Sequence, residues 1–433
     1  MTDIDIDSLF FPSQHITEPK WFAGRKKDIE SALQSLCTPG ASMIVFGERG
    51  SGKTSFVEMV KLLATGTSDL LYKHNFHKRF QPSKFKYKVI SFACNAETDT
   101  TAKVLQNLIT NPDGLKKLIS SRIDQIEETV NGKLSIDFLK LFSLGVEGEK
   151  KVTFTEYKED SIFELFTNLI ITVSKELLSH EEGLLIVVDE FDLVKDRAKM
   201  ASLIKTLSKD KVKFLLCGIA DTFDDLIEGH QSIMRQILYG RIRINLMTEE
   251  EIREVYALVK INSDQKIQFE NEFIKLVKQK SNGFPYYVQL FGKLSVDEYI
   301  NIKGIHFPMI IHNQHLISGI KKLSFYESQM EDDYQNIIKN NPHKEFILKF
   351  LAKQVTRKIK DEEVFAHCFK HNLRQPIPKN TLASLLASRE PYFLNRENEK
   401  SDYVSFFDPL FKTFVNARET DLIKFENDEY ILP

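Results

Sequence analysis

The sequence has few cysteines, and no cluster of metal-ligating residues stands out in it. Four cysteines are scattered over 433 residues, without the close pairs of a zinc site or the density of a disulfide framework. We interpret them as small buried apolar residues: Cys37, Cys94, Cys217 and Cys368. His367 and His371 lie four residues apart, but no second ligand pair accompanies them, which argues against a metal site.

Long apolar runs and an excess of one charge are also lacking. No run approaches the length of a membrane-spanning helix, and the acidic start Met1 to Asp7 is unlike the basic start of a secretory signal. A formal charge of −2 gives no global field toward nucleic acid or acidic membranes, so such binding would need a local patch. We expect a cytosolic protein with no membrane partner and, at this length, two or three domains.

One segment with a strong chemical signature is present. Residues 47–54 read GERGSGKT, the G-x-x-x-x-G-K-T pattern of a phosphate-binding loop, between a strand-like run over 42–46 and a helical pattern over 55–64. Glycines allow the loop to turn its N–H groups toward an anion. Lys53 would reach the β and γ phosphates, and the Thr54 hydroxyl would bind Mg²⁺. The predicted nucleotide contacts are Gly47, Glu48, Arg49, Gly50, Ser51, Gly52, Lys53, Thr54 and Ser55.

A second segment supplies the carboxylates that such a site needs. The apolar run over 184–188 is typical of a central parallel strand, and it ends in Asp189 and Glu190. Asp189 is predicted to orient Mg²⁺, and Glu190 to polarise the water that attacks the γ phosphate. The alternative is that the acidic pair only begins a solvated turn. Asp192 is expected to be a helix cap or a surface charge.

Strand-like and helix-like segments alternate through the first half of the chain. We expect strands over 86–94, 213–218 and 241–246, and helices over 29–36, 161–178, 196–208 and 223–238. The pattern weakens over 111–160, which we interpret as an insertion. This rhythm predicts an α/β fold, a parallel sheet with helices on both faces.

The order of these motifs resembles that of the prokaryotic AAA+ and STAND-type P-loop ATPases, relatives of the replication-initiator ATPases, over roughly residues 10–300. The residues that carry the resemblance are Phe22, Gly24, Arg25, the phosphate loop, Asp189, Glu190, Gly218 to Asp221, Ser232, Arg235 and Ser281 to Pro285. The resemblance implies ATP and Mg²⁺ as ligands. It divides the chain into an ATPase core (1–247), a small helical lid with a linker (248–324) and a C-terminal domain (325–433).

Further site residues are implied by the resemblance. Trp21, Phe22 and Gly24 would border the adenine; alternatively, Trp21 and Phe22 staple the entrance of the first helix. Asp221 and Thr222 are candidates for the polar sensor, although the usual Asn or Thr directly at the strand end is missing.

Arg235 is the candidate arginine finger, a cation given to the site of a neighbouring subunit to neutralise transition-state charge. Arg241 and Arg243 are alternatives, and Arg235 lying along a solvated helix face is another. A finger acting in trans would make the protein a homo-oligomer.

The segment Gly283-Phe284-Pro285 resembles the Gly-x-Pro turn of STAND switches, where Pro285 would pack beside the nucleotide. Replication initiators usually carry a sensor arginine in this lid helix, and this sequence departs from them here.

The last third of the sequence has a winged-helix pattern. Helices are expected over 345–352, over 361–369 and from Pro378. A hairpin over 392–406 and a helix from Asp408 follow. Basic residues outnumber acidic ones between 339 and 379, but the third helix offers few side chains for reading base edges. We favour protein contact or autoinhibitory docking over DNA binding.

Taken together, the sequence predicts an ATP-binding and ATP-hydrolysing molecular switch that oligomerises and controls a separate effector protein. The resemblance suggests a bacterial defence or mobile-element system. The alternatives are a DNA-binding initiator or loader of the origin-recognition type, and a nucleotide-binding scaffold without turnover.

Overall fold

The computed structural model describes residues 5–120, 159–178, 182–209, 211–227, 233–339, 342–354, 359–360, 362–364, 366, 394–395, 403–406, 409–418, 425–426 and 429–430. The chain divides into two compact units. The first is His15–Asn245, and the second joins Met1–Gln14 to Leu246–Pro433. The expected core ended at residue 247. The observed unit ends two residues earlier, and the first fourteen residues group with the C-terminal unit.

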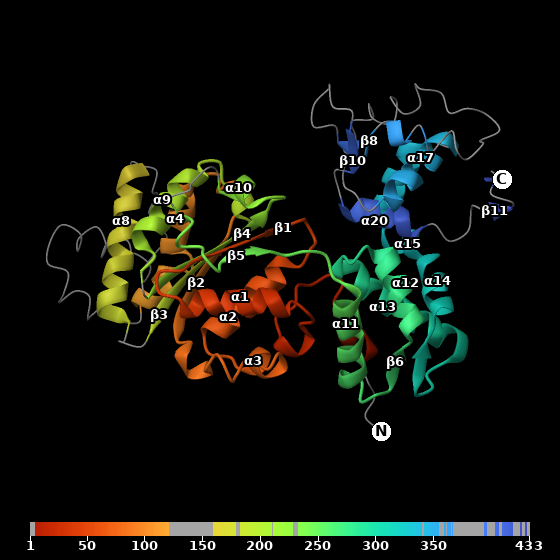
Figure 1. Ribbon diagram of the computed structural model, residues 1–433, viewed down its shortest axis with the longest axis horizontal. Helices are drawn as coiled ribbons and strands as arrows, with labels where there is room; N and C mark the ends of the chain where they lie inside the picture. The colour runs from red at the N-terminus through yellow and green to blue at the C-terminus, as the bar shows by residue number, and fades with distance from the viewer. Residues whose placement is uncertain are drawn as a thin grey trace, which may run out of the picture. The chain divides into compact units, whose positions relative to one another are not determined.

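A five-stranded sheet with the order β2-β3-β4-β1-β5 forms the centre of the first unit (Figure 1). Its strands are β1 (Met43–Gly47), β2 (Tyr87–Ala93), β3 (Gly183–Asp189), β4 (Val212–Ile219) and β5 (Arg241–Arg243). All neighbouring strands pair in parallel, with Val187 of β3 beside Leu215 of β4 and Ile44 of β1 beside Leu216. Their carboxyl ends therefore reach one edge, where open α/β sheets bind ligands.

Helices cover both faces of this sheet, as the alternating pattern predicts (Figure 1). One face carries α1 (Lys26–Cys37), α2 (Lys53–Ala64) and α3 (Asp69–Lys73). The other carries α4 (Thr101–Thr110), α5 (Leu115–Ser120), α8 (Glu159–Thr172), α9 (Arg197–Leu207) and α10 (Phe223–Leu226). Successive β3 residues point to opposite faces: Leu184 and Ile186 join one hydrophobic cluster, and Leu185 and Val187 the other. The α/β parallel fold is confirmed.

A lysine is enclosed at the amino-terminal end of β4. The Lys213 side chain is 0% exposed, and its Nζ donates to the carbonyls of Ser35, Thr38 and Ala41 at 2.9, 2.5 and 3.2 Å. These carbonyls lie in and just after the last turn of α1, where helices leave backbone acceptors without partners. A cation at that position satisfies them and complements the helix dipole.

The predicted helix over 223–238 is wrong in its extent. Among the residues of this range that the structure describes, only those of α10 are α-helical, and residues 233–240 form turns before β5. The carbonyls of Gln236 and Gly240 accept the N–H groups of Ser42 and Ile44 at 2.5 and 2.7 Å. These two carbonyls bind the start of β1, so they do not accept the hydrogen bonds of a continuing helix. The strand expected over 241–246 is likewise shorter, and the helix expected over 161–178 ends in a π-helical turn, η5 (Val173–Leu177).

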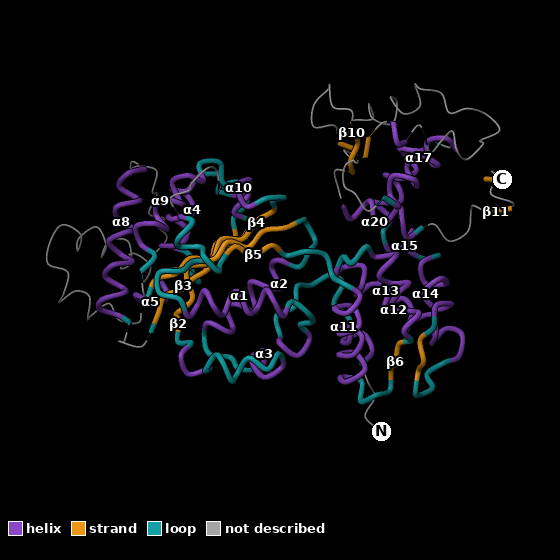
Figure 2. The backbone as a smooth tube through the Cα atoms, viewed as in Figure 1, coloured by secondary structure: helices purple, strands orange, loops and turns teal. Residues whose placement is uncertain are grey.

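The second unit is largely helical (Figure 2). Its helices are α11 (Glu249–Asn262), α12 (Asn271–Ser281), α13 (Pro285–Lys303), α14 (Asn313–Ile320), α15 (Leu323–Tyr326), α16 (Ser328–Ile338), α17 (Pro342–Lys353) and α20 (Pro409–Ala417). The strands β6 (Ile267–Phe269) and β7 (Met309–Ile311), which the sequence did not predict, pair in parallel. A capping box between Thr248 and Glu251 begins α11.

The C-terminal part agrees with the predicted elements where it is described. α17 and α20 lie at the expected helices, and β9 (Leu394–Asn395) pairs antiparallel with β10 (Tyr403–Phe406), as the hairpin requires. β10 also pairs with β8 (Ile359–Lys360), and β11 (Phe425–Glu426) with β12 (Glu429–Tyr430). Most of the helices expected over 361–369 and from Pro378 lies outside the described residues, so the winged helix stays a prediction.

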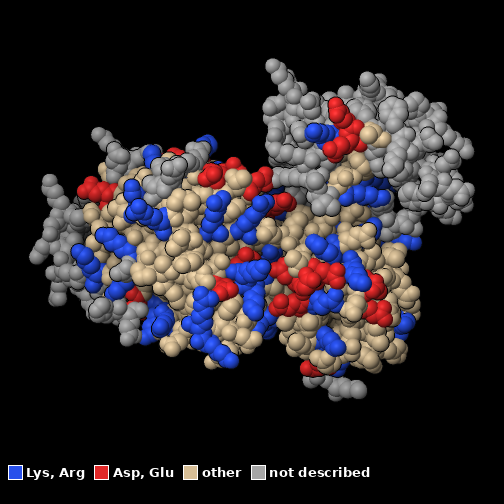
Figure 3. Space-filling model, in the orientation of Figure 1, with Lys and Arg blue, Asp and Glu red and all other residues tan. Residues whose placement is uncertain are grey.

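The surface carries charges of both signs. In Figure 3 acidic side chains gather over α11, whose first turn contains Glu249, Glu250 and Glu251. Within the described ranges, no helix is long and apolar enough to cross a membrane, and no group of three or more acidic, histidine or cysteine side chains is arranged to hold a metal.

Cys94 and Cys217 are buried as predicted. Cys37 is exposed at the end of α1, contrary to the prediction, and Cys368, His367 and His371 lie outside the described residues.

Candidate active site

The phosphate loop leaves β1 and enters α2 through three glycines with positive φ. The φ angles of Gly47, Gly50 and Gly52 are 153°, 77° and 94°, a region that favours glycine. Gly47 is also required by space, because a Cβ there would lie 2.4 Å from the carbonyl oxygen of Ile244. Gly52 is the N-cap of α2, so the helix presents its amino-terminal N–H groups to the loop.

Lys53 is buried at the start of α2 and folds back over the loop. Its Nζ donates to the carbonyls of Gly47 and Glu48 at 3.2 and 2.9 Å. Burial lowers the pKa of the ammonium group, while the negative charges of Asp189, Asp192 and Glu190 raise it again. The cation is thus held among backbone acceptors inside the loop, within reach of an anion that the loop would surround.

The two predicted Mg²⁺ ligands lie together. The Thr54 Oγ1 donates to Asp189 Oδ2 at 3.2 Å, although 135 residues separate them in sequence. Thr54 comes from the first turn of α2, and Asp189 is the last residue of β3. A hydroxyl beside a carboxylate at this edge is the oxygen donor set that Mg²⁺ prefers in phosphate sites.

Glu190 follows Asp189 in a left-handed conformation, with φ 56°. Its backbone N–H donates to Asp189 Oδ1 at 2.8 Å, which ties the bend to the carboxylate before it. Burial, followed by the charges of Asp189 and Asp192, raises the pKa of its carboxyl group above the ordinary value. A non-glycine residue in this conformation is uncommon and often marks a functional position.

Asp192 has a role that the sequence did not predict. Its Oδ1 accepts the backbone N–H of Ile219 at 2.8 Å, so it ties the bend after β3 to the end of β4. Arg197 supports the same bend by donating to the carbonyls of Asp192 and Val194 at 2.5 and 2.6 Å. Asp192 therefore joins the segment after β3 to the end of β4 and is not a helix cap.

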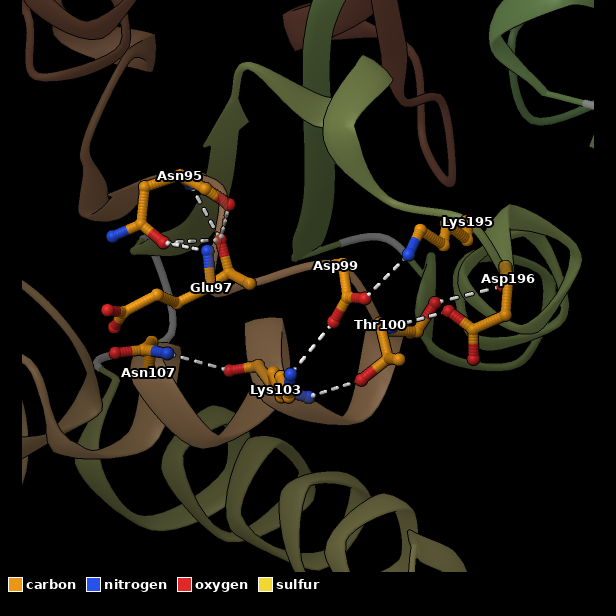
Figure 4. A network of polar contacts seen from close by, with 10 residues as sticks. Asn95, Glu97, Asp99, Thr100, Lys103, Asn107, Lys195 and Asp196 are labelled. Carbon is orange, nitrogen blue, oxygen red and sulfur yellow. Dashed lines mark hydrogen bonds and ion pairs between the residues drawn. The ribbon is translucent and has the colours of Figure 1, made fainter.

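A polar network fixes the other side of this bend (Figure 4). Asp99, in the loop after β2, pairs with Lys103 at 2.8 Å and with Lys195 at 2.9 Å. These two lysines lower the pKa of Asp99 to about 2. The backbone N–H of Thr101 donates to Asp196 Oδ1 at 2.6 Å. The loops that leave β2 and β3 are thereby held together next to Asp189 and Glu190.

The aromatic residues before α1 are partly core residues. The side chain of Phe22 is 5% exposed and belongs to the hydrophobic cluster under α1 and α2, while Trp21 is half-buried at the end of the 3₁₀ turn η2 (Pro19–Trp21). Gly24 is buried with φ 69°. Ser55 accepts the N–H of Ile16 through its hydroxyl at 2.9 Å.

Arg25, which the sequence indicated only as part of the resemblance, contacts the phosphate loop through its guanidinium group. It is 7% exposed, with φ 60°. Its Nη2 donates to the carbonyl of Ser51 at 2.9 Å and its Nη1 to that of Asn245 at 2.5 Å. No short motif announces a contact across 220 residues, so sequence reasoning could not find this role.

The remaining candidates have less distinctive surroundings. Thr222 caps α10 in a capping box with Asp225, and Asp221 is exposed beside it. Arg235 is exposed in a turn, not along the helix that the sequence predicted. Arg241 lies over the ring of Phe223 at 4.9 Å, and Arg243 is exposed at the end of β5. Pro285 belongs to the second unit, at the first position of α13.

The residues of the loop fit a nucleotide polyphosphate. Ser51 Oγ is buried without a hydrogen-bond partner, Lys53 is buried among carbonyls, and the Thr54 hydroxyl lies beside the Asp189 carboxylate. A parallel sheet with this order, a complete phosphate loop and carboxylates on β3 define a P-loop NTPase.

The family model of Novel STAND NTPase 1 matches residues 14–285, well over half of the chain. The protein belongs to this family of nucleoside triphosphatases.

Similar solved structures are distant. One is a Walker-type ATPase of Pyrococcus abyssi, 14% identical, with 94% of this chain and 99% of that one covered and a TM-score of 0.45. Others are the Aeropyrum pernix Orc1 protein in complex with DNA (11% identity, 92% and 93% covered, TM-score 0.40) and Cdc6p from Pyrobaculum aerophilum (11%, 96% and 97%, 0.41). No curated protein matches the chain.

Proposed function

We propose that the protein is a cytosolic ATP-hydrolysing molecular switch that acts as a homo-oligomer and controls a separate effector protein. The observation that supports it best is the grouping of Lys53, Thr54, Asp189 and Glu190 at one edge of the sheet. The family resemblance suggests a bacterial defence or mobile-element system as the setting. The C-terminal region, folded as a winged helix, would contact the partner protein.

In this proposal the loop N–H groups and Lys53 would bind the β and γ phosphates of ATP, and Thr54 and Asp189 would hold Mg²⁺. The metal would neutralise charge on the phosphate oxygens. Glu190 accepts the proton of a water whose oxygen attacks the γ phosphorus while the bond to the β–γ bridging oxygen breaks, which releases ADP and phosphate. The raised pKa of Glu190 makes its carboxylate a better proton acceptor than an ordinary one.

Arg235 would complete the site of a neighbouring subunit. It is exposed in the turn before β5, so its guanidinium is accessible to a second copy of the chain. A permanent cation that reaches the transferred phosphoryl group in this way typically raises turnover by about 1,000-fold or more.

Mixing of inactive variants tests the assembly. Lys53→Ala should lose ATP binding, and Arg235→Ala should bind ATP but stall. If the finger acts in trans, a mixture of the two should recover turnover, because intact Lys53 sites are then served by intact arginines. Arg253→Ala, which removes a partly exposed arginine paired with Glu249 at 2.9 Å, is the control and should remain active.

Two outcomes would change the proposal. Full turnover by Arg235→Ala alone would exclude it as the finger and direct the same test to Arg241 and Arg243. Strong stimulation of turnover by duplex DNA, with binding that falls steeply as salt is added, would favour the initiator or loader alternative.

A further inference from the structure

The segment Ile244–Met247 connects the two units, and each of its ends is held by hydrogen bonds within the unit to which it belongs. We propose that Arg25 and Lys278 are positioning residues that couple the phosphate loop to the Gly283-Phe284-Pro285 turn through this connector. The inference rests on the proposed function, because it requires a nucleotide in the loop.

The first end of the connector is fixed to the phosphate loop. The N–H of Ile244 donates to the carbonyl of Phe46 at 2.8 Å, and the Ile244 carbonyl lies against Gly47 so closely that a Cβ would not fit. Arg25 then joins Asn245 to Ser51 by donating to both carbonyls. Any ligand that reshapes the loop at Ser51 therefore acts on a guanidinium that also holds the last residue of the first unit.

The second end is fixed to the turn before α13. The N–H of Met247 donates to the carbonyl of Gly283 at 2.8 Å. Lys278 Nζ donates to the carbonyl of Met247 at 2.7 Å and to that of Asn282 at 3.4 Å. A Cβ at Gly283, where φ is 86°, would lie 2.3 Å from the Met247 oxygen, so only glycine permits this approach.

The turn is held in the same way by the C-terminal region. Asn282 Nδ2 donates to Thr413 Oγ1 at 3.3 Å, and Asn416 Nδ2 donates to the carbonyl of Gln279 at 3.0 Å. Tyr287 donates through its hydroxyl to the carbonyl of Leu410 at 3.2 Å. A displacement of the connector at Met247 would thus reach α20 through the hydrogen bonds of Asn282, Asn416 and Tyr287.

Two lysines three residues apart in the chain make a matched pair for the test. Lys278 is partly buried against the connector, and burial lowers the pKa of its ammonium group. Lys275, also on α12, is exposed and pairs with Glu272 at 3.0 Å. Lys278→Met keeps an unbranched side chain, one atom shorter, and removes its donors, and Lys275→Met is the control.

Hydrogen exchange of the full-length protein, with and without ATP and Mg²⁺, gives the readout. In the wild type we expect ATP to slow exchange both in the loop peptide 47–54 and, by about tenfold, in the connector peptide 244–249, the effect of one or two hydrogen bonds. Lys278→Met should keep the protection of the loop peptide and lose most of that of the connector. Lys275→Met should behave like the wild type.

Arg25→Lys is a second variant, made from the other end of the connector. Arg25 reaches the Asn245 and Ser51 carbonyls from two separate nitrogens, and the single nitrogen of a lysine does not reproduce that spacing. ATP-dependent protection of the connector should therefore fall here too. Wild-type protection of the loop without protection of the connector, or unchanged connector protection in Lys278→Met, would overturn the inference and leave the proposed function standing. No protection of the loop in the wild type would refute both.

Discussion

The two units of the chain use different means to place their functional residues. In the first unit, Asp189 ends β3, and the phosphate loop that follows β1 leads to Lys53 and Thr54 at the start of α2. The parallel sheet brings these residues to one edge. In the second unit, Pro285 begins a helix after a turn. Met247 and Lys278 donate hydrogen bonds to this turn, and its Asn282 side chain donates one to Thr413. The sheet topology thus places the predicted site residues of the first unit, whereas a few hydrogen bonds place the turn before Pro285 in the second unit.

This difference has a consequence for substitutions. Changes at the sheet edge should remove a chemical step while the unit stays folded, since the strands are held by two hydrophobic clusters and not by the site. Changes around the turn should instead alter how the second unit responds to nucleotide. Each of the following experiments tests one side of that contrast.

The largest effect is expected for Glu190→Gln. The amide cannot accept a proton, so turnover should fall by about 1,000-fold while ATP affinity changes little. Single-turnover hydrolysis and equilibrium binding of a fluorescent ATP analogue would separate the two quantities. Turnover equal to that of the wild type would show that Glu190 is not the base.

Lys53→Ala should weaken ATP binding by about 100-fold, because it removes charge-assisted hydrogen bonds to the phosphates. Lys61→Ala is the control. Lys61 is also on α2, but it lies outside the loop and forms an ion pair with Glu58 at a distance of 2.8 Å. Titration calorimetry would measure both. A Lys53 variant that binds ATP as the wild type does would mean that the loop does not hold the phosphates.

A smaller effect is expected from trimming the two cores. Ile204 of α9 and Ile252 of α11 are both fully buried, and Ile→Val at each should lower the free energy of unfolding by about 0.5–1.5 kcal/mol. If the units unfold separately, calorimetry should show each variant shifting only one transition. Ile261→Val, at a site 60% exposed on α11, should shift neither.

The smallest effect concerns pH. Glu190 must be ionised to accept a proton, and its pKa is raised by burial and then by Asp189 and Asp192, so turnover should fall on the acid side at a higher pH than an ordinary carboxyl would give. Asp192→Asn removes one negative charge and keeps an oxygen for the Ile219 N–H. The acid limb should therefore move down by less than about one pH unit.

Asp224→Asn, on the exposed side of α10, is the matching control for this pH experiment. An acid limb unmoved by Asp192→Asn would assign it to another group.

Sequence reasoning was most successful where a short pattern encodes both conformation and chemistry. The glycines of residues 47–54 and the apolar run before Asp189 predicted the strands, the loop and the meeting of Thr54 with Asp189. Sequence reasoning failed where contacts between residues far apart in the chain determine the local structure. Residues 233–238 were predicted to be helical, yet the structure has turns there, and the carbonyls of Gln236 and Gly240 accept hydrogen bonds from Ser42 and Ile44 at the start of β1. Arg25 and Asp192 are ordinary charged residues until the fold supplies carbonyls and an N–H for them.

The enclosure of Lys213 provides a natural reporter. An amine that is 0% exposed and bonded to three carbonyls cannot meet an acylating reagent while α1 and β4 stay packed. Covalent tagging of this one side chain, read by mass spectrometry, would therefore record each opening of the nucleotide-binding unit without any engineered label.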